Sequence, residues 1–194
     1  MKQSNYAGVI LAAGKSERFG AAKILADWHG EVLLRYITKK VLNVGLNSTV
    51  VVLGSVVGPA IEVLSDLPVE VVINHQFSLG IGTSFSKGVS ALPKSLAGAF
   101  LFLCDQPFFS KELIDAMIGV SDDVDVVVPT VNGSPGHPVL WKQQTFDRIR
   151  KMDHGETGRS IQKEINSLEC PWHDGKILLD IDTQQDYDRL INYS

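Results

Sequence analysis

A short run of mostly small residues, followed by two cations, stands out near the start of the chain. The cations are Arg18 and Lys23, and the residues before them are Leu11, Ala12, Ala13 and Gly14. Small side chains let backbone N–H groups approach an anion closely, and Arg and Lys neutralise phosphate charge. A tight strand-to-helix turn with two solvated cations explains the same composition, so both interpretations stay open from these residues alone.

Two common phosphate-binding motifs do not fit this loop. Gly14-Lys15-Ser16 resembles the end of a P-loop, but the first glycine of that motif falls on Val9. The dinucleotide-binding fingerprint needs three glycines at fixed offsets, which Gly14 and Gly20 do not supply. If the loop binds phosphate, it does so by another arrangement.

Carboxylates follow two further apolar runs. Asp105 comes after the run 99–103, and Asp180 and Asp182 come after the run 177–179. Ligands of open parallel sheets bind at the carboxyl ends of strands, and Mg²⁺ takes one or two carboxylates plus phosphates and water. We therefore expect Asp105 to hold Mg²⁺ together with either Asp180 or Asp182, of which Asp182 is the candidate second ligand. Asp105 capping a turn and Asp182 beginning a helix are the structural alternatives.

Three other loops carry glycine with polar side chains. They contain Asn74, Gly80 and Ser84; then Gly136, His137 and Pro138; and finally Arg159. Gly80 permits close backbone approach to a ligand, and a helix starting near Ser84 would direct its N-terminus at it. A histidine in a constrained turn is usually structural, but irregular segments often hold substrate.

Strand-like and helix-like segments alternate through the first two thirds of the chain. Strands are expected at 7–11, 49–53, 69–73, 99–103 and 124–128, and helices at 32–44, 59–64, 84–92 and from Ser110. This alternation predicts an α/β fold of three layers, with a mostly parallel sheet between helices on both faces.

The pattern is less regular after Pro129. Residues 130–138 form a loop or hairpin, 139–141 an edge strand and 176–179 a strand, with helices at 143–152, 157–165 and 183–190. Thr183 is the expected cap of the last helix. Without an internal repeat or linker, residues 1–194 are expected to form a single domain.

Composition excludes several classes of protein. The net charge of −4 disfavours a nucleic-acid reader, which usually carries a basic excess. No apolar run approaches the roughly 20 residues that cross a bilayer, and no signal peptide is evident. Cys104 and Cys170 show no metal-ligand spacing, so they are expected to be reduced thiols, with Cys104 buried. We expect a cytoplasmic protein with no membrane or nucleic-acid partner.

Together these motifs resemble the nucleotidyltransferase superfamily that includes the molybdenum cofactor guanylyl- and cytidylyltransferases. The opening motif L-A-A-G-x-S-x-R-x-G-x-x-K is present between Leu11 and Lys23. The landmarks around Asn74, Asp105, Gly136, Arg159 and Asp182 follow in family order over nearly the whole chain. The cytidylyltransferase branch is the more similar one, because the guanylyl branch usually has glycine at the place of Ala13.

The resemblance implies a Rossmann-like nucleotidyltransferase sheet and a Mg²⁺-dependent reaction. CMP would pass from CTP to a molybdopterin-type cofactor, pyrophosphate would leave, and a molybdoenzyme would receive the product. Arg18, Lys23 and Asp105 are implied to be catalytic. The nucleotide would contact Leu11, Ala12, Ala13, Gly14, Lys23, Asn74, Gly80 and Ser84. The acceptor would lie against Gly136, His137, Pro138 and Arg159, and the metal against Asp105 and Asp182.

Three rival functions remain. One is guanylyl or other nucleotidyl transfer to a different phosphorylated acceptor, such as a sugar phosphate. The second is a non-catalytic nucleotide-binding accessory protein for molybdoenzyme maturation. The third is a purely structural α/β domain, which leaves the grouping of Arg18, Lys23 and Asp105 unexplained.

Overall fold

Strand β1 (Tyr6–Ala12) lies in the middle of the main sheet, and all seven of its residues are buried. The computed structural model describes residues 3–16, 18–152 and 154–193. β1 pairs in parallel with β4 (Ser48–Leu53) on one side and with β6 (Gly98–Leu103) on the other. A continuous apolar run suits this central place, because both faces of the strand are covered.

The main sheet has eight strands, in the order β10-β7-β9-β6-β1-β4-β5, with β8 paired to β7. β9 runs antiparallel to both of its neighbours, whereas β10–β7, β6–β1, β1–β4 and β4–β5 are parallel pairs. The remaining strands are β5 (Glu70–Ile73), β7 (Val126–Val131), β8 (Ser134–Pro135), β9 (Val139–Lys142) and β10 (Ser167–Pro171). The mostly parallel sheet is therefore confirmed.

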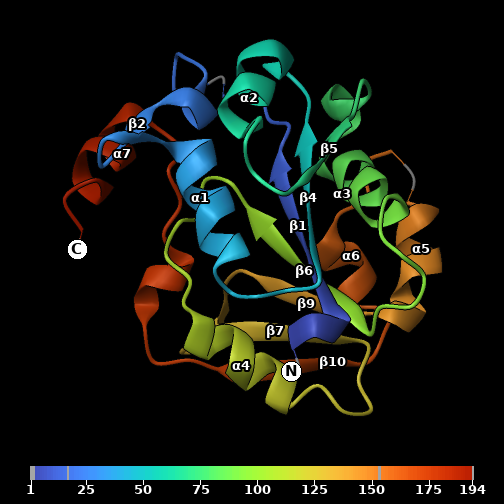
Figure 1. Cartoon of the computed structure of the whole chain (residues 1–194). Helices are drawn as coiled ribbons and strands as arrows, with labels where there is room; N and C mark the ends of the chain where they lie inside the picture. The colour runs from blue at the N-terminus through green and yellow to red at the C-terminus, as the bar shows by residue number, and fades with distance from the viewer. Residues whose placement is uncertain (1–2, 17, 153, 194) are drawn as a thin grey trace.

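Helices cover both faces of this sheet (Figure 1). One face packs against α1 (Leu33–Leu42), α2 (Val57–Leu64), α4 (Lys111–Gly119) and α7 (Gln184–Leu190). The other packs against α3 (Ile81–Ser90), α5 (Phe146–Arg150) and α6 (Gly158–Gln162). Alternate residues of β1 point into the hydrophobic cores on the two faces of the sheet: Ile10 belongs to the core on the first face and Val9 to the core on the second. The three-layer α/β prediction is confirmed.

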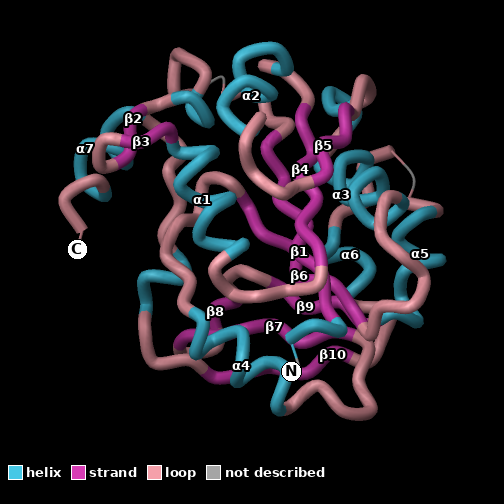
Figure 2. Tube along the Cα trace, viewed as in Figure 1, coloured by secondary structure: helices cyan, strands magenta, loops and turns pink. Residues whose placement is uncertain are grey.

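Short elements connect these layers. They are the 3₁₀ helices η1 (Gln3–Asn5), η2 (Lys23–Leu25), η3 (Phe77–Leu79), η4 (Gln143–Thr145) and η5 (Gly175–Leu178), and a hairpin of β2 (Asp27–Trp28) and β3 (Glu31–Val32). The hairpin lies beside α7, apart from the main sheet (Figure 2). The Tyr187 hydroxyl of α7 donates a hydrogen bond to the Asp27 carbonyl, which joins the C-terminal helix to the hairpin.

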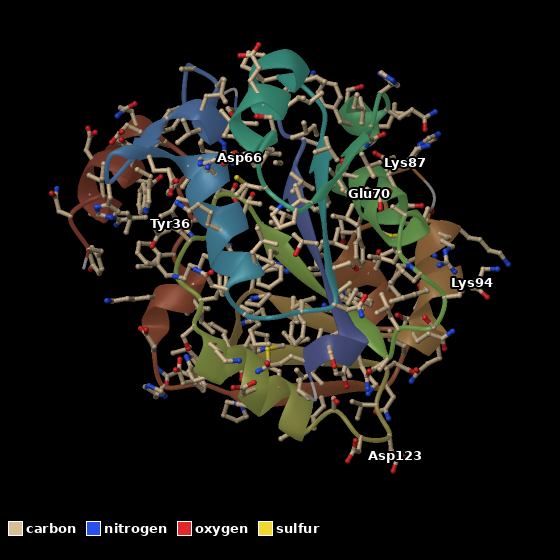
Figure 3. The ribbon with its side chains drawn as sticks, viewed as in Figure 1. Tyr36, Asp66, Glu70, Lys87, Lys94 and Asp123 are labelled. Carbon is tan, nitrogen blue, oxygen red and sulfur yellow. The ribbon has the colours of Figure 1, made fainter. Side chains whose placement is uncertain are left out.

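Several predicted helix ends are confirmed. Ser110 caps α4 by accepting a hydrogen bond from the Leu113 N–H at 3.2 Å. Thr183 caps α7, and Asp186 completes the capping box. The exposed side chains of Lys87, in α3, and of Lys94, in the turn that follows α3, project outward from the molecule (Figure 3). In the part of the chain that the structure describes, no helix is long and apolar enough to cross a membrane.

The structure corrects two predictions in the second half of the chain. Residues 139–141 are not an edge strand, because β9 lies inside the sheet between β6 and β7. Residues 176–179 are not a strand: η5 occupies this place, and β10 is the strand that the sequence pattern missed. β10 alternates polar and apolar residues at the sheet edge and ends in Pro171, so its pattern is short and weak.

Three predicted helices have different bounds. The helix expected at 84–92 begins earlier as α3, whose N-cap is Gly80. The segment 143–152 divides into η4 and α5, and the helix expected at 157–165 ends at Gln162. Helix ends depend on tertiary contacts that a periodic pattern does not contain.

Close packing of α3 on the sheet gives a stability prediction. A Cβ added at Gly88 would lie 2.4 Å from Val9 Cγ1 and 3.0 Å from Val52 Cγ2. We expect Gly88→Ala to lower the free energy of unfolding by about 1–3 kcal/mol, because the methyl overpacks this contact. Gly119→Ala at the end of α4, where an added Cβ meets nothing within 4 Å, is the control and should raise stability by about 0.5–1 kcal/mol. Urea denaturation of both variants measures this, and equal effects would contradict the packing assignment.

Candidate active site

The carboxyl ends of the parallel strands bring the predicted site loops to one edge of the sheet. The loop after β1 contains Gly14, and the segment after β6 contains Asp105. The Cys104 N–H donates to the Leu11 carbonyl at 3.1 Å, which keeps these two segments adjacent. The Ile181 N–H donates to the Asp105 carbonyl at 2.9 Å, so the chain around Asp182 joins them.

Lys23 lies between two carboxylates at this edge. Its Nζ is 2.9 Å from Asp105 Oδ2 and 3.7 Å from Asp182 Oδ1. Arg18 Nη2 approaches the other Asp182 oxygen at 2.9 Å. Lys23 is only 8% exposed, so its charge needs nearby compensation, whereas the Arg18 side chain is 73% exposed. Four predicted site residues thus form one charge cluster, which we call the Lys23 cluster: Arg18, Lys23, Asp105 and Asp182.

A third carboxylate lies beside the Lys23 cluster. Burial, followed by repulsion from Asp182 and Asp105, raises the pKa of Asp180. Either Asp180 or Asp182 was expected beside Asp105; Asp180 lines the main cavity, whereas Asp182 lines the basin and pairs with Lys23. Among the described residues, no group of three or more His, Cys, Asp or Glu side chains is arranged to hold a metal ion.

Asn74 is buried and fixes the start of α3. Its Nδ2 donates to Thr83 Oγ1 and Ser84 Oγ, both at 2.9 Å, and its Oδ1 accepts from the Gln76 N–H. Gly80, with a φ of 121°, makes the turn into α3 that an L side chain would strain. These bonds indicate that Asn74 positions the α3 entrance rather than facing a ligand.

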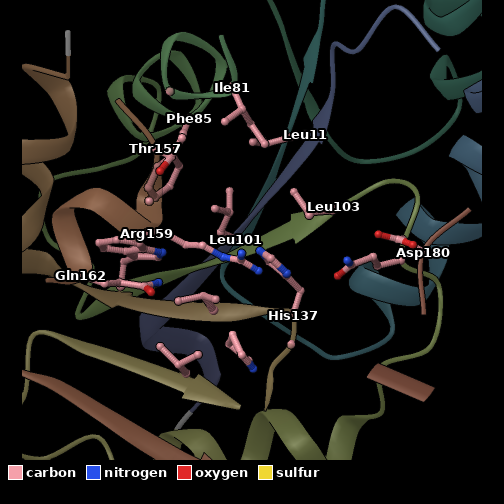
Figure 4. Close-up of a pocket in the computed structure, with 18 residues that line it drawn as sticks. Leu11, Ile81, Phe85, Leu101, Leu103, His137, Thr157, Arg159, Gln162 and Asp180 are labelled. Carbon is pink, nitrogen blue, oxygen red and sulfur yellow. The ribbon is translucent and has the colours of Figure 1, made fainter. Parts of the chain in front are cut away.

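A depression of about 330 Å³, called the main cavity below, is shown in Figure 4. Its apolar wall comes from Leu11, Ile81, Phe85, Leu101 and Leu103, and its polar side chains include His137, Arg159, Gln162 and Asp180. Apolar walls with a few placed polar groups are typical of small-molecule sites.

A more open basin of about 530 Å³ adjoins the main cavity; its lining includes Gly14, Arg18, Lys23, Gly80 and Asp182. A smaller cavity of about 200 Å³ joins the two, because it shares Gly14 with the basin and Leu11 with the main cavity. Ala13 and Ser84 line this connecting cavity. A cationic basin and an apolar cavity therefore lie near each other, with the connecting cavity between them.

Most predicted site residues line these spaces. Ala12 lies beside Asp105 in a small cavity of about 70 Å³, and Gly136 lines the main cavity with His137 and Arg159. Two predicted residues do not line them: Asn74 and Pro138, both of which are buried. Several residues that line these spaces were not predicted: Phe77, Ile81, Gln106, Thr157 and Gln162. Gln106 directly follows Asp105, and this position next to a predicted site residue could have indicated that Gln106 also belongs to the site.

His137 is held in its neutral form. Burial lowers its pKa to about 4, and Arg159 adds to this effect while Asp105 opposes it. The unfolded chain therefore binds more protons than the folded chain between about pH 4 and pH 6.5, so stability falls as the pH drops through this window.

Urea denaturation at two pH values tests this assignment. Between pH 7 and pH 5, His137 should lower the free energy of unfolding by about 1–2 kcal/mol, and His137→Gln should lack this contribution. An unchanged pH dependence in the variant would show that the imidazole is not held neutral.

Comparisons with known proteins agree with this geometry. A family model described as the MobA-like NTP transferase domain matches residues 8–169. The probable molybdenum cofactor guanylyltransferase of Bacillus cereus (strain AH820) is 34% identical over 131 residues. That match covers 67% of this chain and 64% of the relative, so the chain spans less than two thirds of the length of that relative.

Two solved structures share the fold. A Mycobacterium tuberculosis Rv0371c homologue from Mycobacterium sp. strain JC1 is 26% identical, with a TM-score of 0.82 over 97% of this chain and 96% of that chain. Rv0371C from Mycobacterium tuberculosis H37Rv, solved in complex with manganese, is 22% identical, with a TM-score of 0.81 over 97% of this chain and 99% of that chain. Because the family model covers most of its length, the chain belongs to the MobA-like NTP transferase domain family.

Proposed function

We propose that this chain transfers a nucleoside monophosphate from a nucleoside triphosphate to the phosphate of a molybdopterin-type cofactor. The observation that carries the proposal is the Lys23 cluster, which borders a cationic basin near the main cavity. The family match and the name of the Bacillus relative support the same reaction class.

In the proposed reaction, an acceptor phosphate oxygen attacks the α-phosphorus. A new P–O bond forms there, the bond to the β-phosphate oxygen breaks, and pyrophosphate leaves. The backbone from Leu11 to Gly14 contacts the nucleotide, while Lys23 and Arg18 neutralise phosphate charge as it develops. Lys23 is held in place by two carboxylates, so little reorganisation is needed during the reaction.

Asp105 and Asp182 are the proposed Mg²⁺ ligands. Both offer hard carboxylate oxygens, each side chain is about 30% exposed, and Asp182 faces the basin where the phosphates would lie. Two carboxylates suit Mg²⁺, which completes its coordination with substrate phosphates and water and neutralises their charge when bound. The manganese complex of Rv0371C, a protein of the same fold, is consistent with a divalent cation here.

The main cavity is the proposed acceptor site. Its apolar wall suits a fused ring, and Arg159 offers a fork of N–H donors for a phosphate. Neutral His137 can donate or accept a hydrogen bond without adding charge. Gly136 lies close to η5, where an added Cβ would come within 2.9 Å of the Ile177 carbonyl oxygen, and Pro138 is buried. A molybdoenzyme is the proposed recipient of the product.

The proposed nucleotide is CTP, on the basis of Ala13 in the first loop. GTP is the second candidate, because the Bacillus relative is named as a guanylyltransferase. Ala13 lines the connecting cavity, and the proposed role of its methyl group is to limit the space for a base there. A non-catalytic accessory role is the remaining alternative, and it predicts nucleotide binding without turnover.

Replacing Lys23 tests the proposed reaction. We expect Lys23→Met to lower pyrophosphate release, measured with Mg²⁺, CTP or GTP and a molybdopterin-type acceptor, by about 10²-fold or more. Lys39→Met is the matched control, since Lys39 pairs with Glu31 on the surface and should retain wild-type activity. Circular dichroism checks that both variants fold. Wild-type turnover in folded Lys23→Met would refute the role of Lys23.

Replacing Ala13 tests the choice of nucleotide. Ala13→Gly removes one methyl group from the connecting cavity, so we expect the ratio of kcat/KM for CTP over GTP to fall by about tenfold. Ala116→Gly in α4 controls for the effect of a new glycine on stability. If the ratio is the same in wild type and Ala13→Gly, base selection lies elsewhere in the site.

A further inference from the structure

The loop that precedes Arg159 carries an ion pair that lies outside the main cavity, the basin and the connecting cavity. Arg148 of α5 donates to Glu156 through two nitrogens: Nη1 lies 3.2 Å from Oε2, and Nη2 bonds Oε1. Glu164 also approaches Arg148 Nη2, at 3.4 Å. Two parallel bonds between a guanidinium and a carboxylate fix direction as well as distance. We call this contact the Arg148–Glu156 pair.

The helix that carries Arg148 is fixed against α3. The two helices lie side by side (Figure 1), and both contribute side chains to the core on the second face of the sheet. The Ser86 hydroxyl of α3 donates to the Arg150 carbonyl of α5 at 3.0 Å. Arg150 Nη2 approaches the Val89 carbonyl of α3 at 3.5 Å. The Arg148 guanidinium therefore extends from a supported helix to the loop that contains Glu156.

The backbone at Glu156 packs closely on the start of α3. A Cβ added at Gly82 would lie 2.4 Å from the Glu156 carbonyl oxygen. A Cβ added at Gly80 would lie 3.8 Å from the Gly155 nitrogen. The segment 154–156 is therefore held in two ways, by its backbone packing on α3 and by its side-chain bonds to Arg148.

The residues that follow Glu156 form part of the main cavity wall. Thr157 caps α6, and Thr157, Gly158 and Arg159 line the cavity (Figure 4). A Cβ added at Gly158 would lie 3.1 Å from Trp141 Cζ2, so this turn also packs on the ring of another lining residue. Because Arg159 is only three residues from Glu156, a displacement of Glu156 also displaces the Arg159 guanidinium. Displacements of about 1 Å are enough to weaken a positioned contact strongly.

We propose that Arg148 is a positioning residue for the acceptor site, because it holds Glu156 and thereby fixes the place of Arg159 in the main cavity. This inference rests on the proposed function, which takes the main cavity as the acceptor site. The start of α3, on the nucleotide side, has a separate support in the hydrogen bonds from Asn74. Loss of the Arg148–Glu156 pair therefore weakens acceptor binding and leaves triphosphate binding intact.

Steady-state kinetics separate this role from a general loss of stability. Pyrophosphate release would be measured with Mg²⁺, CTP or GTP and a molybdopterin-type acceptor. In Arg148→Met, KM for the acceptor should rise about tenfold or more, whereas KM for the triphosphate should stay within about twofold of wild type. Arg148→Lys keeps the charge without the fork, so its acceptor KM should lie between these values.

A second bidentate pair in the chain provides the matched control. Arg35 Nη1 and Nη2 bond the two carboxylate oxygens of Asp66, at 2.5 and 2.7 Å, and neither residue lines the main cavity or the basin. Arg35→Met removes the same kind of interaction and should leave both KM values unchanged. Circular dichroism checks that all variants fold.

A double-mutant cycle tests whether Arg148 acts through Glu156. Glu156→Gln should raise the acceptor KM as Arg148→Met does. The double variant should be no worse than either single variant, because the same interaction is lost in all three.

A ligand-free measurement tests the loop position without turnover. 6-Fluorotryptophan places fluorine on Cη2, which in Trp141 lies 3.7 Å from a Cβ added at Gly158. The three ¹⁹F signals of the chain would be assigned by Trp→Phe variants. Arg148→Met should shift or broaden the Trp141 signal and leave the Trp28 and Trp172 signals unchanged, and Arg35→Met should leave the Trp141 signal unchanged.

The possible outcomes separate this inference from the proposed function. The inference is wrong if the triphosphate KM rises as much as the acceptor KM, if Arg35→Met has the same effect, if the two single effects add, or if the Trp141 signal does not change in Arg148→Met. Absence of wild-type turnover with this acceptor would instead refute the proposed function, and the Trp141 signal would then decide whether Arg148 positions the cavity wall.

Discussion

The ammonium group of Lys23 between the Asp105 and Asp182 carboxylates is the interaction on which the arrangement of the site depends. A lysine that is only 8% exposed needs opposite charge close by, and here that charge comes from two segments distant in sequence. The β1–β6 pairing places the first loop beside Asp105, and the bond from the Ile181 N–H to the Asp105 carbonyl adds the Asp182 segment. Three parts of the chain are therefore held around one cation.

The surrounding fold holds the Lys23 cluster at the carboxyl edge of a sheet that is packed on both faces. Buried strands and two helical layers support the loops, and Asn74 fixes the start of α3 opposite the Lys23 loop. The segment after β6 is part of the same arrangement, because Asp105 lines the small cavity beside Lys23 and pairs with it.

Local patterns in the sequence predicted the strands of the first half, the three layers and the caps at Ser110 and Thr183. These features depend on long apolar runs and capping residues, which can be recognised from a few neighbouring positions in the sequence. The interior place of β9, the edge strand β10 and the pairing of Lys23 with Asp182 depend on contacts between distant segments, for which no local pattern exists. The roles of the site residues came from the family motif, whereas Ile81 and Gln162 joined the site only through tertiary packing.

Anomalous diffraction from crystals grown with Mn²⁺ and a non-hydrolysable nucleoside triphosphate tests the central claim most directly. The account predicts one manganese peak in contact with the Asp105 and Asp182 carboxylates, with the triphosphate against Lys23 and the base over the connecting cavity. A triphosphate bound away from the Lys23 cluster, or manganese held by other residues, would contradict it.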